Sequence, residues 1–160
     1  MGTRITAMNL KTTKPVIAAA FCLWATTAMA ADVTATWTSA SNGQWTTPAN
    51  WSTVTTYPDN GASTYDAVIN MAGRQVTLDG SVDPNVTIEK FTLAGTDHSL
   101  ASLIGANSPT LTVNGLFTWK AAHLTGGGTL NAKGGILFTC PDYTDPINNT
   151  WTLNLEGTSN

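Results

Sequence analysis

Residues 77–80 read Thr-Leu-Asp-Gly, and this pattern returns four times in altered form. The five copies start 15, 20, 17 and 23 residues apart. A repeat of about 19 residues suits one coil of a β-solenoid, in which each coil contacts only its neighbours. The later copies are Thr92-Leu93-Ala94-Gly95, Thr112-Val113-Asn114-Gly115, Thr129-Leu130-Asn131-Ala132 and Thr152-Leu153-Asn154-Leu155.

Apolar residues alternate with threonine in these segments, which is the pattern of a strand with one buried face. Apolar spacings of three and four residues are rare, so helices are not expected. The alternation changes phase at Glu89-Lys90, which predicts a bend where the chain turns a corner. The residues expected to stack inside the coils are Val76, Leu78, Phe91, Leu93, Leu111, Val113, Leu130, Leu137 and Leu153.

Asparagine occupies the third position of the last three copies, at Asn114, Asn131 and Asn154. Stacked in register, these amides can hydrogen-bond from coil to coil; the alternative is that they are ordinary turn residues. The fold class predicted is all-β, a right-handed parallel β-helix. The irregular spacing leaves a β-sandwich as the alternative.

Residues 1–30 have the pattern of a cleaved secretory signal. A basic start precedes an apolar run at residues 16–27, and Ala28-Met29-Ala30 supplies the small residues at which signal peptidase cuts. We expect cleavage after Ala30 and a protein that is secreted or held at the bacterial cell surface. The alternatives are an uncleaved anchor or, through Cys22, a lipoprotein. No later segment is apolar and long enough to span a bilayer as a helix.

Without the leader the chain carries ten acidic and four basic side chains, a net charge near −6. Nucleic-acid binding is not expected, because it needs cations to neutralise phosphates. Cys140 is the one cysteine after the leader, and we interpret it as a small buried residue or as half of an intermolecular disulfide. The four cations are Arg74, Lys90, Lys120 and Lys133.

Residues 31–75 are rich in aromatic side chains and are interpreted as an N-terminal cap, with the solenoid coils at 76–160. Trp37, Trp45 and Trp51 are the candidate binding residues, because flat aromatic rings can stack on sugars. The alternative is that the three rings close the N-terminal end of the solenoid.

The stretch from Trp37 to Trp51, followed by Tyr57-Pro58 and Asp66-Ala67-Val68-Ile69, resembles the opening of bacterial exported β-strand-repeat surface proteins. These include autotransporter-passenger-like and filamentous-haemagglutinin-like chains. Val-Thr-Leu-Asp-Gly at 76–80 and Leu-Thr-Val-Asn-Gly at 111–115 match their repeat style, and the resemblance covers nearly all of 35–138. It implies a right-handed parallel β-helix, export, and a role in adhesion or as a stalk.

The chain departs from that family in being short and in lacking a C-terminal barrel or anchor segment. We expect a fragment, a truncated reading frame or a short relative, in which an open last coil allows end-to-end self-association.

Side chains suited to catalysis are sparse, and no catalytic or metal-binding residues are predicted. His98 and His123 have no histidine or cysteine neighbour in the sequence. Asp79, Asp83 and Asn85, and the pair Asp142 and Asp145, are interpreted as turn residues rather than as a Ca²⁺ site.

The function expected is therefore that of a structural or adhesin-like protein, not an enzyme, without a cofactor, whose partners are host or cell-surface glycans or proteins. The alternatives are a carbohydrate-binding module that uses the three tryptophans and a polysaccharide-active β-helix enzyme.

Overall fold

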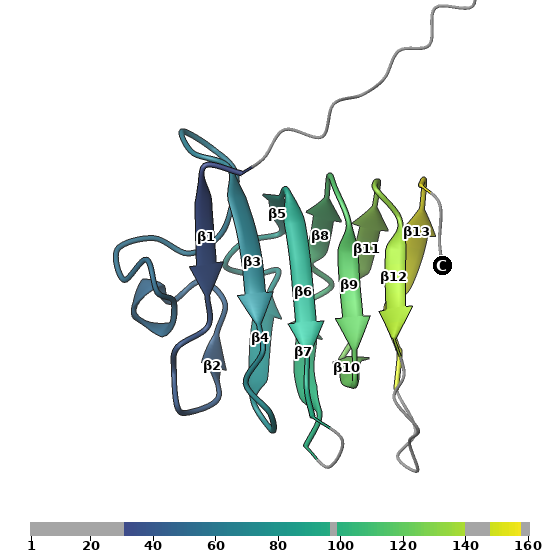
Figure 1. Ribbon diagram of the computed structural model, residues 1–160, viewed down its shortest axis with the longest axis horizontal. Coiled ribbons are helices and arrows are strands. Elements are labelled where there is room, and N and C mark those ends of the chain that lie inside the picture. The colour runs from purple at the N-terminus through teal and green to yellow at the C-terminus, as the bar shows by residue number, and fades with distance from the viewer. Residues whose placement is uncertain (1–30, 97–98, 140–147, 158–160) are drawn as a thin grey trace, which may run out of the picture.

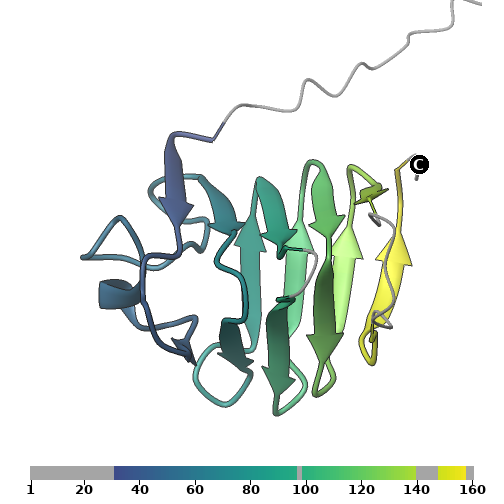
Figure 2. The same ribbon diagram turned by 60° about the horizontal axis from the view of Figure 1, so that its bottom comes forward.

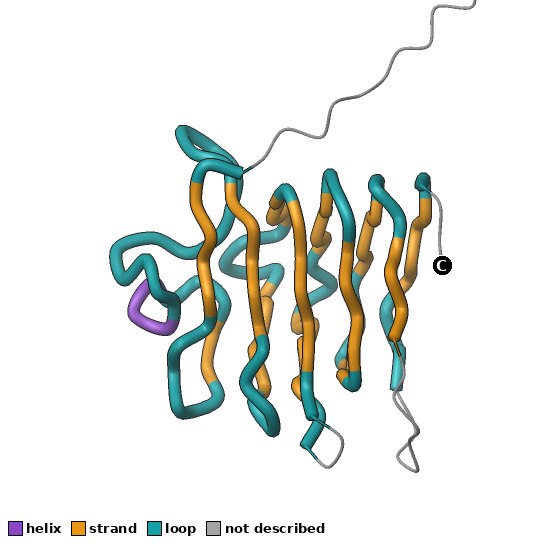
Figure 3. The backbone as a smooth tube through the Cα atoms, viewed as in Figure 1, coloured by secondary structure: helices purple, strands orange, loops and turns teal. Residues whose placement is uncertain are grey.

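The computed structural model describes residues 31–96, 99–139 and 148–157. The predicted leader, the Asp97-His98 pair, Cys140, Asp142 and Asp145 lie outside these residues. In the described part the strands form three sheets, and one short 3₁₀ helix, η1 (Pro48–Asn50), follows β2. Figure 3 shows η1 in the irregular segment at the N-terminal end of the stack.

Each sheet takes about one strand from every coil, and every pairing between named strands is parallel. The first sheet contains β1 (Val33–Thr36), β3 (Tyr65–Ile69), β6 (Lys90–Ala94), β9 (Phe117–Lys120) and β12 (Ile136–Thr139). The second contains β2 (Gly43–Gln44), β4 (Gln75–Asp79), β7 (Ala101–Ala106) and β10 (Ala122–Thr125). The third contains β5 (Asn85–Ile88), β8 (Thr110–Val113), β11 (Thr129–Ala132) and β13 (Thr152–Leu155).

The chain winds as a right-handed parallel β-helix. In Figure 1 the first sheet runs downward at the front and the third runs upward at the back, while the chain advances from left to right. Figure 2 shows the same strands side by side in rows. The predicted fold class is confirmed, and the β-sandwich is excluded because a sandwich is built from antiparallel neighbours.

The bend predicted at Glu89 is also confirmed. β5 ends at Ile88 in the third sheet and β6 begins at Lys90 in the first, so the phase change in the alternation marks a corner. The side chain of Glu89 holds this corner, because its Oε1 accepts hydrogen bonds from Asn60 Nδ2 at 2.8 Å and Asn114 Nδ2 at 2.9 Å.

The interior is filled by columns of apolar side chains that stack from coil to coil. Val86, Leu111 and Leu130 are paired in the third sheet and are all 0% exposed. In the first sheet Phe91 stacks on Phe117, with ring centroids 5.1 Å apart and 11° between the ring planes.

The coils are less regular than the sequence repeat predicts. Along the first sheet Ala67, Phe91, Phe117 and Ile136 are successive partners, so the steps are 24, 26 and 19 residues. Among the five copies only the last two are in register, with Thr129 opposite Thr152. If the five copies were one coil apart, Leu93, Val113 and Leu130 would share one column, and the structure shows that they do not.

Those three residues lie in different columns for a simple reason. Leu93 belongs to the first sheet, whereas Val113 and Leu130 belong to neighbouring columns of the third. A Thr-Leu pair marks a strand with one buried face, and every sheet of the solenoid needs such strands. The motif therefore identifies strands without saying to which sheet each one belongs.

The predicted inward position of Leu137 is also wrong. It pairs with Thr118 on the outer face of the first sheet and is 40% exposed. Ile136, its neighbour in the chain, pairs with Phe117 and takes the inward position at 7% exposure. The run Ile-Leu-Phe at 136–138 has no alternation of its own, so the sequence does not show which residues point inward.

The tryptophan-rich segment is built into the same stack. β1 and β3 continue the first sheet, and β2 pairs with β4 in the second, so the sheets cross the boundary placed between residues 75 and 76. In the described part of the chain no helix is long and apolar enough to span a membrane.

Candidate functional site

The three tryptophans predicted as binding residues form one buried cluster. Trp37, Trp45 and Trp51 are 1%, 0% and 0% exposed. Trp51 meets the other two rings edge-on, with centroids 5.2 Å from Trp37 and 4.9 Å from Trp45. Trp45 in turn contacts Phe91 at 5.8 Å, which joins the cluster to the aromatic column of the first sheet.

The indole N–H groups of this cluster are all hydrogen-bonded to backbone oxygens. Trp51 Nε1 donates to the carbonyl of Trp45 at 2.7 Å, and Trp45 Nε1 donates to the carbonyl of Pro58 at 3.0 Å. Trp37 Nε1 donates to the carbonyl of Ser39 at 3.1 Å. A buried ring with its polar atom satisfied has no free face for a sugar, so the packing favours the alternative in which the three rings close the end of the solenoid.

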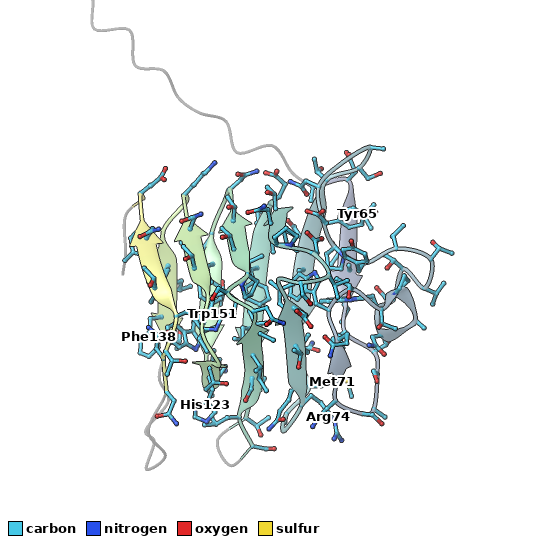
Figure 4. The ribbon with its side chains drawn as sticks, turned by 180° about the vertical axis from the view of Figure 1, so that it is seen from behind. Tyr65, Met71, Arg74, His123, Phe138 and Trp151 are labelled. Atoms are coloured by element: carbon cyan, nitrogen blue, oxygen red, sulfur yellow. The ribbon has the colours of Figure 1, made fainter. Side chains whose placement is uncertain are left out.

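A pocket of about 270 Å³ opens next to this cluster, at the N-terminal end of the stack. Figure 4 shows Tyr65 at that end and Trp151 and Phe138 at the other. The pocket combines two phenol rings, a proline ring, two hydroxyl groups and one carboxylate. Its lining residues are Pro48, Thr55, Thr56, Tyr57, Asp59 and Tyr65.

Hydrogen bonds hold the phenol groups in place. Tyr57 donates its hydroxyl to Asp83 Oδ2 at 3.2 Å, and Tyr65 donates its hydroxyl to Thr56 Oγ1 at 3.2 Å. The orientation of both rings is therefore fixed before a ligand binds, which lowers the entropy cost of binding.

The segment that carries Tyr57 and Asp59 is itself fastened to the stack. The backbone N–H of Thr87 donates to Asp59 Oδ1 at 2.8 Å, and the N–H of Asn60 donates to the carbonyl of Thr87. With the bond from Trp45 to Pro58, these contacts make the buried tryptophans a support for the pocket rather than its lining.

Two ionisable groups of the pocket have shifted pKa values. Burial raises the pKa of Asp59, and the nearby charge of Asp83 adds to this, while hydrogen bonds from the backbone of Thr87 and Asn60 act in the opposite direction. Burial and the carboxylate of Asp83 also raise the pKa of Tyr57, which keeps its phenol protonated at neutral pH. The pocket thus offers hydroxyl groups and one acidic acceptor.

Comparison of the chain with protein-family models, with curated proteins and with solved structures found no match.

Asp79 and Asp83, two of the carboxylates interpreted as turn residues, do stabilise turns. Asp79 Oδ1 accepts hydrogen bonds from the backbone N–H of Ser81 at 2.9 Å, from its hydroxyl at 2.7 Å and from Asn107 Nδ2 at 2.8 Å. The bond from Asn107, followed by those from Ser81, lowers the pKa of Asp79. Asp83 Oδ1 accepts from the backbone N–H of Asn85 at 3.3 Å. Across the described ranges no three His, Cys, Asp or Glu side chains gather to hold a metal ion.

His123 is the histidine that the described residues include. Its Nδ1 accepts a 3.0 Å hydrogen bond from the backbone N–H of Asn148, which links β10 to a segment 25 residues further along the chain.

Tyr57 and Tyr65 are the site residues that sequence reasoning missed. In the sequence Tyr57 belongs to the stretch that carries the family resemblance and Tyr65 to the aromatic-rich segment, and neither ring is predicted to bind a ligand. The tripeptide Tyr57-Pro58-Asp59 carried a usable signal, because a proline and an aspartate favour a turn and a turn places the preceding aromatic ring near solvent.

Proposed function

We propose that this chain is an exported β-helix with a structural or adhesive role at the bacterial cell surface, related to the β-strand-repeat surface proteins that it resembles. The observation that carries the proposal is the stack itself, whose outer faces carry many threonine, asparagine and serine side chains and offer neutral hydrogen-bonding groups to a partner. The signal pattern at residues 1–30 supports export. The proposal assigns the protein no catalytic step.

Export is tested by producing the full chain in a bacterium and determining the N-terminus of the processed protein. We expect it to start at Ala31 and to be found outside the cytoplasm. Ala30→Arg, which removes the small residue at the cut, should leave the leader attached. An intact leader on the parent chain in the cytoplasm would contradict the proposal.

Binding of a neutral glycan is a second candidate, favoured by the pocket between Tyr57 and Tyr65. Sugar binding needs an apolar ring face beside hydrogen-bonding groups, and this pocket has both. A glycan array probed with the parent chain and with Tyr57→Ala tests it. The variant should lose binding, whereas Thr92→Ala, on the outer face of the first sheet, should not. Equal binding by the parent and Tyr57→Ala would rule out this pocket.

We also propose that copies of this chain associate end to end. At the last described coil Leu137, Phe138 and Leu155 are 40%, 43% and 48% exposed, although Phe138 and Leu155 continue interior columns. A second copy could cover them by adding a coil. Sedimentation of the parent chain should then depend on concentration, and Phe138→Ser should reduce association. A parent chain that stays monomeric at all concentrations would exclude this arrangement.

A further inference from the structure

The outer face of the third sheet differs from the rest of the surface in composition. Its four strands point eight side chains outward, and every one is threonine or asparagine. None of them is buried. The eight residues, which we call the Thr/Asn face, are Asn85, Thr87, Thr110, Thr112, Thr129, Asn131, Thr152 and Asn154.

The other two sheets break this pattern. On the first sheet Asp66 and Lys90 form an ion pair at 3.8 Å, and the exposed Leu137 continues the column of Thr118. On the second sheet Ile104 and His123 interrupt the hydroxyl groups. An uncharged polar surface without an apolar side chain is thus particular to the third sheet and is not a general consequence of a threonine-rich sequence.

The Thr/Asn face is a grid of two columns. Asn85, Thr110, Thr129 and Thr152 are successive partners in one column, and Thr87, Thr112, Asn131 and Asn154 in the other. Parallel strands lie about 4.8 Å apart, and outward residues of one strand repeat at about 6.6 Å. The hydroxyl and amide groups therefore recur at two fixed distances.

The grid is also held rigid. Asn154 Nδ2 donates to Asn131 Oδ1 at 2.8 Å, and Asn131 Nδ2 donates to Thr112 Oγ1 at 3.3 Å. The β-branched threonines have restricted side-chain rotation. Behind the face the paired residues Leu111 and Leu130 are fully buried, so the backbone that carries the grid is fixed by the core. Side-chain ladders of this kind allow a sheet to remain flat.

A rigid and regularly spaced grid suits a ligand that is itself an uncharged lattice. Ice surfaces repeat their oxygen atoms at two distances of similar size, and each water both donates and accepts hydrogen bonds, as hydroxyl and amide groups do. Sugar chains fit less well, because sugar recognition relies on aromatic rings and none of the eight residues is aromatic. We propose that the Thr/Asn face binds the surface of ice.

The Thr/Asn face and the pocket of Tyr57 and Tyr65 are neighbours, since the backbone N–H of Thr87 donates to Asp59 of the pocket. None of the eight residues of the face lines the pocket, and the two proposals name different ligands. A failure of one proposal therefore leaves the other intact. Adhesion to ice is compatible with a surface-exposed protein, but it does not require export to be correct.

The test is partition of the purified chain into slowly growing ice, with a non-binding protein in the same solution as reference. The parent chain should be enriched in the ice, and Thr129→Tyr, which places a large ring in the middle of the grid, should fall to the level of the reference protein. Thr118→Tyr is the matched control, since it makes the same change on the outer face of the first sheet. It should bind ice like the parent.

Far-UV circular dichroism and the melting temperature are measured for every variant. If Thr129→Tyr does not fold, Thr152→Tyr at the exposed end of the same column replaces it, with the same loss expected. Exclusion of the parent chain from ice overturns the proposal, and so does an equal loss in Thr118→Tyr. Retention on crystalline cellulose without enrichment in ice also overturns it and would assign the face to a polysaccharide.

Discussion

The side-chain amide of Asn154 donates a 2.8 Å hydrogen bond to the side-chain oxygen of Asn131, which stands opposite it in the neighbouring coil. Asn131 makes a second bond of this kind, because its own amide donates to Thr112 Oγ1 at 3.3 Å. Side chains as well as backbone thus tie β13 to β11 and β11 to β8. In a solenoid, where each coil contacts only its neighbours, such links add to the stability of the interface between coils.

Asn131→Ala should lower the free energy of unfolding by about 1–3 kcal/mol, since one side chain serves both bonds and each contributes about 0.5–1.5 kcal/mol net. Urea unfolding followed by tryptophan fluorescence measures the change. Asn85→Ala is the control on the same outer face, and a change within about 0.5 kcal/mol is expected there. If both variants unfold alike, the amide contacts do not stabilise the stack.

The amide ladder illustrates how far the sequence could predict the structure. The link between Asn131 and Asn154 follows from two copies of the motif in register. Asn114 does not join it, because that side chain donates to Glu89 at the corner instead. Alternation within most strands and the bend at Glu89 are local properties that the sequence shows, whereas the run Ile-Leu-Phe at 136–138 has no alternation. Register between coils depends on the lengths of the intervening turns, which differ from coil to coil and carry no periodic signal.

The candidate site could likewise be predicted from the sequence only in part. A tryptophan-rich cluster near the N-terminus was evident from the sequence, but its exposure was not. Trp45 packs against Phe91, which lies 46 residues further along the chain. Such a contact between distant segments decides whether a ring is core or surface. The pocket of Tyr57 and Tyr65 likewise forms only when the segment containing Pro58 folds back onto β5 and the buried indoles.

Leu111→Ala should lower the free energy of unfolding by about 2–5 kcal/mol, because it removes a fully buried side chain between Val86 and Leu130 and leaves a cavity. Leu137→Ala is the matched control. Its side chain is 40% exposed on the outer face, so its loss should be well below that of Leu111. Equal effects in thermal or urea unfolding would show that the assignment of inward and outward positions is wrong.

Asp79 should make the stability of the protein sensitive to acid. Its pKa in the folded state lies below the ordinary value of 3.8, so the folded state favours the ionised form more than the unfolded state does. The contribution of Asp79 is therefore present above pH 3.8 and is lost as the pH falls through the folded-state pKa.

Thermal melting of the parent chain and of Asp79→Asn across this pH range measures the effect. The difference in melting temperature should be largest above pH 3.8 and should shrink below it, because the variant has no carboxylate to titrate. Ser81→Ala removes one of the donors to Asp79 and should give an intermediate result. A difference that does not change with pH would mean that these hydrogen bonds do not favour the ionised form.

Gly105→Ala should destabilise the stack, because the neighbouring coil leaves no room for a side chain at Gly105. An added Cβ would collide with the carbonyl oxygen of Gly127 and would lie 2.8 Å from the ring of Trp151. Crowding of this kind in a packed interior costs about 1–3 kcal/mol.

Gly61→Ala is the control, since an added Cβ there has no atom within 4 Å. It should be neutral or slightly stabilising, because alanine lowers the entropy of the unfolded chain. Two variants with the same melting temperature would show that the coils do not approach at Gly105 as closely as the structure has them.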